Sequence, residues 1–106
     1  MSAISIVMVT VGNGEEALSI ARTLVEEKLV ACVNMVPRIR SIYRWKGEIC
    51  DEEELLLIMK TRSELYPALQ NRIRQIHSYE VPEIITFPVT DGLSEYLNWV
   101  VDSTSI

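Results

Sequence analysis

Two extended segments on either side of Lys46-Gly47 constrain the fold of this chain more than any other feature. The outgoing segment continues from Val30 and the returning segment ends at Thr61, and Lys46-Gly47 predicts the two-residue turn of a β-hairpin. Arms of about 13 residues are about 43 Å long at roughly 3.3 Å per residue, whereas a domain of this length has a radius of gyration of about 13 Å. We therefore expect the hairpin to project beyond its own core.

The turn also determines which residues of the two arms face each other. Without a bulge near the turn, Trp45 faces Glu48 and Arg40 faces Glu53, so a basic arm lies along an acidic one. Opposite charges of this kind support strand pairing by roughly a few tenths of a kcal/mol per exposed pair. Pro37 is expected to interrupt or bulge the outgoing arm, because proline cannot donate to a central ladder.

Large apolar side chains lie on the projecting part of the hairpin, namely Ile39, Ile42, Tyr43 and Trp45. Bare strand edges and exposed rings promote aggregation unless another subunit covers them. We therefore predict an obligate oligomer that associates through the edge strands of the hairpin.

The residues before the hairpin predict one strand and one helix. Residues 4–11 are rich in β-branched side chains and end at a Gly-Asn-Gly break, which is typical of a buried strand. Asn13 and Glu16 then predict the start of a helix, because the Asn side chain can cap an N–H group of the first turn. Its apolar positions recur at steps of three and four residues: Ala17, Leu18, Ala21, Leu24, Val25 and Leu29.

The residues after the hairpin predict a second helix, a last strand and a third helix. The second helix would be capped by Ser63 and end near His77, and residues 83–89 read as the strand. Asp91 or Ser94 would open the third helix. Its inward-facing residues are expected to be Leu93, Tyr96, Leu97 and Val100.

The predicted order is β-α-β-β-α-β followed by a C-terminal helix. Two split β-α-β units of this kind form a ferredoxin-like α+β sandwich with an antiparallel sheet. No linker or second unit is apparent, so residues 1–106 are expected to form a single domain.

The composition limits the partners of the chain. Its net charge of −5 provides no general attraction to nucleic acid or to anionic membranes, and neither is expected as a partner. The longest aliphatic run, residues 55–59, is far shorter than the roughly 20 residues of a membrane helix. The first five residues lack the features of a signal peptide, so we expect a cytoplasmic protein. Cys32 and Cys50 have neither disulfide-framework nor CxxC spacing and are expected to be thiols.

His77 is the only histidine and lies in the segment "HSYEVPEI", residues 77–84. An imidazole can bind a metal or act as a base, but a histidine here can equally close the preceding helix, where it favours the helix dipole. A metal site needs about three or four converging donors, and Cys32, Glu80 and Glu83 could join His77 only through the fold.

Two further groups of residues each have a functional and a structural interpretation. Cys32 is either a reactive thiol or a small buried residue of the strand, and the acidic run at residues 51–54 is expected to be solvated. Aromatic and basic residues could line a cleft for an anionic small molecule or form a subunit interface: Tyr43, Trp45, Tyr79, Trp99, Arg38, Arg40 and Lys60. No GxSxG, P-loop or GxGxxG motif is present, so we do not expect an enzyme.

Several segments together resemble the CutA family of divalent-cation tolerance proteins. They appear in the family's order across nearly the whole chain: "ACVN" (31–34), "SIYRWKGEI" (41–49), "LLLIMKT" (55–61), "HSYEVPEI" (77–84) and "YLNW" (96–99). The resemblance implies a ferredoxin-like fold assembled as a stable homotrimer, in which long hairpins pair strand edges between subunits. It also implies a part in tolerance to copper and other divalent metals, with copper binding attributed to the histidine together with cysteine. No enzymatic reaction follows from it.

The chain departs from the family's usual pattern near His77. Ser78 stands where the pattern has proline, which is expected to loosen the backbone before Tyr79. Some members also carry a second histidine and a strand cysteine, at the positions of Ile76 and Val9 in this chain. A copper site built from the two histidines and that cysteine would therefore keep only His77 here.

Three interpretations remain open at this point, and the third is a purely structural trimer whose clefts are incidental. The first is a trimeric protein of metal homeostasis that needs no cofactor and binds Cu(II) or another divalent cation through His77, Cys32 and Glu80. The second is a signalling or adaptor trimer, similar to the PII proteins, that binds a small anion in clefts between subunits. The expected cleft residues are Tyr79, Lys60, Trp45 and Arg40.

Overall fold

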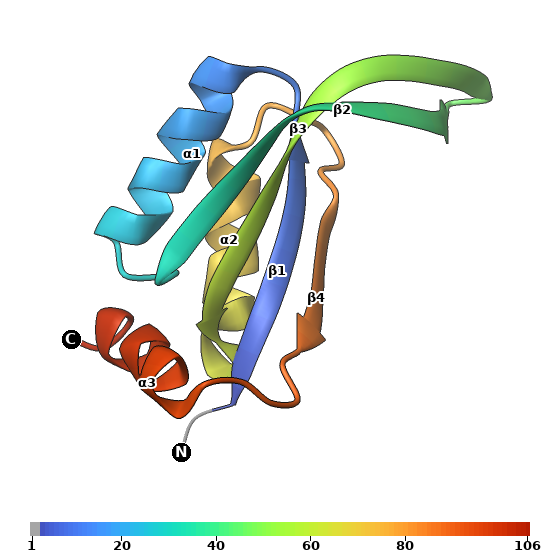
Figure 1. Ribbon diagram of the computed structural model, residues 1–106. Helices are drawn as coiled ribbons and strands as arrows, with labels where there is room; N and C mark the ends of the chain where they lie inside the picture. The colour runs from blue at the N-terminus through green and yellow to red at the C-terminus, as the bar shows by residue number, and fades with distance from the viewer. Residues whose placement is uncertain (1–2) are drawn as a thin grey trace.

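The computed structural model describes residues 3–106, which form a four-stranded antiparallel sheet with helices packed against it (Figure 1). The strand order is β2-β3-β1-β4, as a ferredoxin-like sandwich requires. The elements are β1 (Ile4–Val11), α1 (Gly14–Glu26), β2 (Cys32–Trp45), β3 (Glu48–Arg62), a 3₁₀ turn (Ser63–Leu65), α2 (Tyr66–Ile76), β4 (Ile84–Pro88) and α3 (Ser94–Ser103). The predicted α+β fold and its order of elements are confirmed.

The main core lies between the central strands and helices α1 and α2. Alternate residues of β1 and β3 point to this side, because successive side chains of a strand face opposite sides of the sheet. The buried side chains that meet there include Val7, Val9, Leu57, Met59, Leu24, Leu69 and Ile73. A smaller cluster, formed by Ile4, Ala31 and Val100, packs α3 near the start of β1.

The turn of the hairpin has the predicted geometry. Lys46 and Gly47 have φ angles of +49° and +82°, and the two-residue turn with positive φ at both positions matches the right-handed twist of the strands. Trp45 pairs with Glu48, as predicted.

The bulge in the outgoing arm is also confirmed. The register shifts between Val36 and Ile39, across Pro37, and Arg38 takes a φ of +58° there. Arg40 nevertheless pairs with Glu53 as expected. Beyond the bulge the hairpin curves out past the end of the sheet, and the molecule measures 45 × 25 × 22 Å (Figure 1). The prediction of a projecting hairpin is therefore confirmed.

Helix α1 begins as predicted but buries a partly different face. The Asn13 side chain accepts a hydrogen bond from the Glu16 N–H at 2.9 Å. Leu18 and Val25, which we expected to pack on the sheet, are exposed, and Ile20 is buried instead. The sheet touches a narrower stripe of the helix than the full set of apolar positions suggests.

Two predictions about the later helices are wrong. Ser63 does not cap α2, because a 3₁₀ turn intervenes and the Ser63 hydroxyl is hydrogen bonded to that of Ser5. In α3, Val100 is buried, but Leu93 and Tyr96 are exposed. None of the helices in residues 3–106 is long and apolar enough to cross a membrane.

Candidate functional site

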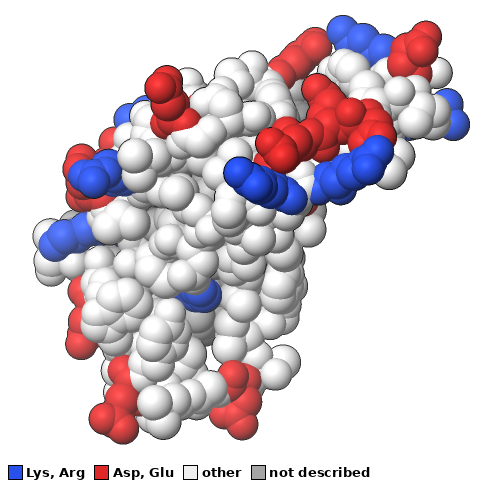
Figure 2. Space-filling view, turned by 45° about the horizontal axis from the view of Figure 1, so that its top comes forward, with Lys and Arg blue, Asp and Glu red and all other residues white. Residues whose placement is uncertain are grey.

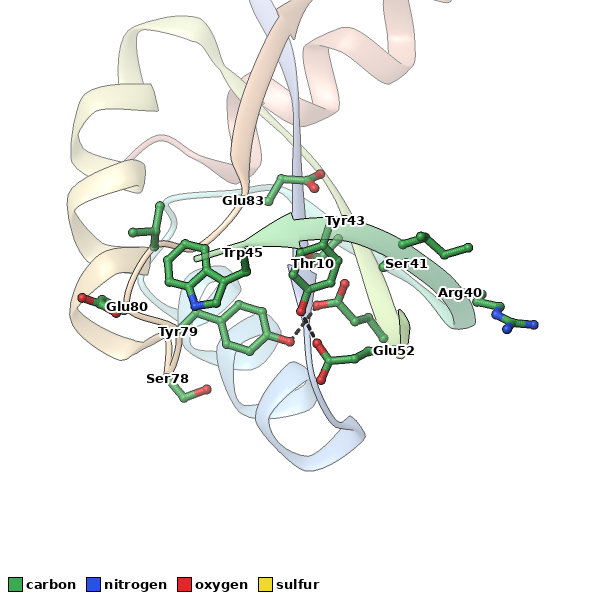
Figure 3. Close-up of a pocket in the computed structure, with 13 residues that line it drawn as sticks. Thr10, Arg40, Ser41, Tyr43, Trp45, Glu52, Ser78, Tyr79, Glu80 and Glu83 are labelled. Carbon is green, nitrogen blue, oxygen red and sulfur yellow. Dashed lines mark hydrogen bonds between the residues drawn. The ribbon is translucent and has the colours of Figure 1, made fainter. Parts of the chain in front are cut away.

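The curved hairpin and the loop between α2 and β4 enclose an open pocket of about 760 Å³ (Figure 3). The returning arm contributes Glu52 and Glu54 from one face, because residues two apart on a strand point to the same side, whereas the outgoing arm contributes residues 40–43 and Trp45. Four carboxylates and three aromatic rings dominate the lining: Glu52, Glu54, Glu80, Glu83, Tyr43, Trp45 and Tyr79. The pocket thus combines negative charge with flat apolar surfaces.

Tyr79 connects the loop to the hairpin at the back of this pocket. Its hydroxyl donates a hydrogen bond to Glu54 Oε2 at 2.6 Å, and only 5% of Glu54 is exposed. Burial raises the pKa of Tyr79, and the bond to the Glu54 carboxylate raises it further, since an ionised phenol would lose this bond and meet a like charge. Tyr79 is therefore a neutral hydrogen-bond donor at physiological pH.

Tyr43 repeats this arrangement on the neighbouring carboxylate. Its hydroxyl donates to Glu52, and this hydrogen bond is the largest cause of a raised Tyr43 pKa. Both phenols hold a glutamate side chain in place on the pocket wall, and neither neutralises its charge.

Gly12 provides the space that Tyr79 occupies. A Cβ atom at residue 12 would lie 2.9 Å from the Tyr79 hydroxyl oxygen, closer than carbon and oxygen atoms normally approach. The glycine that follows β1 therefore allows the contact between Tyr79 and Glu54.

His77 lies behind the pocket with its side chain fully buried. Its Nε2 atom is 2.8 Å from the carbonyl oxygen of Thr10, which can only accept, so Nε2 carries the proton and donates. Its Nδ1 atom accepts from the Tyr79 N–H at 3.1 Å. The hydrogen bonds thus assign a neutral ring in which neither nitrogen has a lone pair free for a metal.

The backbone at His77 also ends α2, as the structural interpretation of this residue expected, although a neutral ring adds no charge to the helix dipole. Its N–H donates to the carbonyl of Ile73 at 2.9 Å, and its own φ and ψ of −87° and 137° are extended. Ser78 follows with two hydrogen bonds to Glu16, from its N–H and from its hydroxyl, each at 2.8 Å. The serine thus supplies two donors that a proline lacks, and both hold this backbone to α1, while the expectation that Ser78 loosens it stays a prediction.

Cys32 and Lys60 lie outside the pocket, opposite each other where β2 begins. Lys60 Nζ donates to the Asn34 side chain, and Cys32 Sγ is 3.6 Å from Tyr96 Oη. Although the residue as a whole is exposed, partial desolvation of its hydroxyl, followed by the bond to Cys32, raises the pKa of Tyr96 to about 12.

A comparison with known protein families identifies the family of this chain. Residues 5–103 match the family described as the CutA1 divalent ion tolerance protein. The chain belongs to this CutA family.

Known relatives agree with this assignment. The divalent-cation tolerance protein CutA of Thermus thermophilus is 48% identical over 99 residues, which cover 93% of this chain and 96% of the relative. Protein CutA of the mouse is also 48% identical over 97 residues, but the chain spans only 55% of its length. The crystal structure of CutA1 from Ehrlichia chaffeensis, 37% identical, superposes with a TM-score of 0.95 over 100% of this chain and 99% of that one.

The pocket of this CutA family member contains only part of the predicted site. Trp45, Arg40, Tyr79 and Glu80 line it, whereas His77 lies behind it. Arg40 points away, as Figure 3 shows, and forms two hydrogen bonds with Asp51 at 2.8 and 2.6 Å.

The predicted metal ligands, His77, Cys32 and Glu80, do not form a cluster in this chain. Across residues 3–106, no group of three or more His, Cys, Asp or Glu side chains is arranged to hold a metal ion. The three residues therefore remain a prediction, and the described part of this chain, residues 3–106, provides no ready-made site for them.

Sequence reasoning missed the carboxylates of the pocket. The run at residues 51–54 was expected to be solvated, yet Glu54 is buried. The hairpin register held the necessary signal, because Ser41 pairs with Glu52, and Ser41 shares its face with Tyr43 and Trp45. Figure 2 shows acidic side chains gathered over the curved hairpin with basic ones beside them.

Proposed function

We propose that this CutA family member acts in divalent-cation tolerance as a homotrimer that binds cations reversibly and catalyses no reaction. The observation that carries the proposal is the charge of the pocket. Four glutamates line it, and the guanidinium of Arg40, the only lining Lys or Arg in the described chain, is already paired with Asp51. A cleft of one sign concentrates ions of the opposite sign.

The same charges speak against the alternative of an anion-binding trimer similar to the PII proteins. That alternative relied on Arg40 and Lys60. Arg40 is engaged by Asp51, and Lys60 lies outside the pocket with its ammonium on Asn34. An anion in the pocket would meet Glu52 and Glu54 without a free cation beside them.

Cu(II) binding is expected to be weak. His77 can ligate a metal only if it gives up its bond to Thr10 or to the Tyr79 N–H. Losing a buried hydrogen bond costs about 1–3 kcal/mol, which lowers affinity by roughly five- to 150-fold relative to a free imidazole. Reversible binding of this kind suits buffering or sensing more than storage.

Exposed apolar side chains support the homotrimer. Ile42 and Ile49 of the hairpin are 66% and 64% exposed, and Trp45 is also exposed. A second copy that pairs with the hairpin edges would bury these residues. Light scattering is expected to give three times the 12.1 kDa of one chain, and a 12.1 kDa species at micromolar concentration would remove this part of the proposal. We place the protein in the cytosol, where free Cys32 and Cys50 stay reduced.

A calorimetric titration of the purified oligomer with Cu(II) tests the metal function. Variants His77→Gln, Cys32→Ser and Glu80→Gln probe the three predicted ligands, and Glu26→Gln, an exposed carboxylate of α1, is the charge-matched control. Saturable binding that at least one of the three ligand variants weakens, and the control does not, supports the proposal. Heat that never saturates contradicts direct binding, and saturable binding of ATP or phosphate would favour the anion alternative.

A further inference from the structure

The hairpin loses the support of the sheet at one level of the structure. Strand β1 pairs with β3 along its whole length, and its last partner on β3 is Leu55. From Glu54 to the turn, β3 pairs within residues 3–106 only with β2, so this part of the hairpin is a two-stranded ribbon. An isolated two-stranded ribbon is at best marginally stable and twists more strongly than a larger sheet. The direction of the ribbon therefore depends on contacts outside the sheet.

The bulge in β2 lies at the same level as the end of β1. The register shifts between Val36 and Ile39, and Ile39 pairs with Glu54, the first residue of β3 beyond β1. A bulge bends its strand and increases the local twist. Residues 36–39 and Glu54 thus form a hinge, beyond which the hairpin curves away from the sheet (Figure 1).

Tyr79 contacts the chain at this hinge. Its hydroxyl donates to Glu54 at 2.6 Å, and the glycine at residue 12 leaves room for the ring. Glu54 is only 5% exposed, so water competes poorly for this bond. The next residue, Glu80, reaches the tip of the same hairpin, where Lys46 Nζ lies 3.5 Å from its carboxylate. Both members of that pair are exposed, so the Tyr79 bond is the stronger of the two connections.

The loop that carries Tyr79 is itself fixed to the body of the subunit. Ser78 donates two hydrogen bonds to Glu16 of α1, and His77 donates to the carbonyl of Thr10 on β1. Helix α1 and strand β1 both belong to the packed core. The loop therefore connects the core to the hinge of the hairpin.

We propose that Tyr79 is a positioning residue for assembly, which clamps the hinge and presets the angle at which the hairpin meets the next subunit. This inference rests on the homotrimer of the proposed function, in which a second copy covers exposed hairpin side chains such as Ile42 and Ile49. A subunit whose hairpin samples other angles is competent to dock for only part of the time, and its association weakens by that fraction. A preset hairpin avoids this ordering cost.

The rate of trimer assembly tests the clamp. Each variant is diluted from urea to the same micromolar concentration, and light scattering follows the concentration-dependent step to the trimer. We expect Tyr79→Phe to assemble at least about fivefold more slowly than the parent, the lower end of the effect of losing a buried hydrogen bond.

Thr61→Val is the matched control, because it also removes a hydroxyl donor from a buried bond. Thr61 is fully buried and donates to the carbonyl of Leu29 at 2.7 Å, at the end of β3 away from the hinge. This variant loses stability by the same mechanism as Tyr79→Phe, but the clamp stays intact. Its assembly rate should therefore equal that of the parent.

A second variant disturbs the clamp and keeps the Tyr79 hydroxyl. In Gly12→Ala, the new methyl group displaces the Tyr79 ring from Glu54, so assembly should also slow severalfold. Gly14→Ala adds the same methyl group with nothing within 4 Å and should assemble like the parent.

Three outcomes would overturn the clamp. They are a Tyr79→Phe protein that assembles as fast as the parent, an equal slowing in Thr61→Val, and a Gly12→Ala protein that is no slower than Gly14→Ala. In each case the parent still forms a trimer, so the homotrimer stands and only the clamp fails. A parent that stays at 12.1 kDa removes the homotrimer and the clamp together. The calorimetric Cu(II) titration uses the assembled parent and does not depend on the assembly rate.

Discussion

The Tyr79 hydroxyl and the buried Glu54 carboxylate, 2.6 Å apart, join the loop after α2 to the projecting hairpin. Tyr79→Phe removes the donor and leaves a buried carboxylate without it. An unsatisfied buried acceptor costs about 1–3 kcal/mol, so the free energy of unfolding should fall by this amount in urea or guanidinium titrations.

Tyr66→Phe is the matched control for this change. Tyr66 also donates to a side chain, Gln70, but in an exposed bond. Its loss should change the free energy of unfolding by less than about 0.5 kcal/mol. Equal effects of the two substitutions would show that burial of Glu54 does not increase the contribution of the Tyr79 hydrogen bond to the free energy of unfolding.

Gly12, which lies against the Tyr79 side chain, provides a second prediction. In Gly12→Ala the new methyl group meets the Tyr79 hydroxyl at 2.9 Å, so the ring must shift away from Glu54. Overpacking of this kind costs about 1–3 kcal/mol, measurable as a lower midpoint of thermal unfolding. Gly14→Ala, at the first position of α1 with nothing within 4 Å, should be neutral or slightly stabilising. A destabilised Gly14→Ala variant would contradict this account.

Alkaline pH should weaken the fold through Tyr96. Its pKa is raised from 10.0 to about 12 in the folded chain, so the folded state holds the phenolic proton more tightly than the unfolded state does. This contribution is complete below about pH 10 and is lost as the pH rises through about 12. The free energy of unfolding, measured between pH 9 and 12, should fall less steeply in Tyr96→Phe, whereas identical slopes would refute the assignment.

The sequence was sufficient for the hairpin because local rules determine it. The turn type follows from Lys46-Gly47. This turn then determines the strand register, which pairs Trp45 with Glu48. The bulge at Pro37 follows from the missing N–H group. Burial on α1 was less predictable, because Leu18 and Ile20 are equally apolar and only the position of the sheet decides which one is covered.

The site was predicted less well, because it too depends on how segments far apart in the sequence lie in space. The aromatic residues and Glu80 were found, because their residue types are unusual on a hairpin and its facing loop. The carboxylates Glu52 and Glu54 were not, because a run of acidic residues does not reveal that the hairpin curves over the loop. The tautomer of His77 depends on the Thr10 carbonyl, which lies 67 positions away in the sequence.

The last prediction concerns the position where this chain departs from its family's proline. Ser78→Ala removes the hydroxyl bond to Glu16 and keeps the N–H bond, so it should cost about 0.5–1.5 kcal/mol. Ser78→Pro removes both bonds, but the extended backbone of His77 already suits a residue before proline. The proline also lowers the entropy of the unfolded chain, which returns about 0.4–1 kcal/mol.

We therefore expect Ser78→Pro to be no less stable than Ser78→Ala in parallel urea titrations, although it loses one more hydrogen bond. Glu16→Gln tests the other partner. A neutral amide accepts less strongly than a carboxylate, so this variant should be less stable than the parent. The difference should be smaller in a Ser78→Pro background, where only the charge of Glu16 in the first turn of α1 remains. A proline variant much less stable than the alanine variant would mean that the Ser78 N–H bond to Glu16 holds this loop more strongly than an exposed bond should. The serine would then be required in this chain, and the two sequence patterns would not be interchangeable.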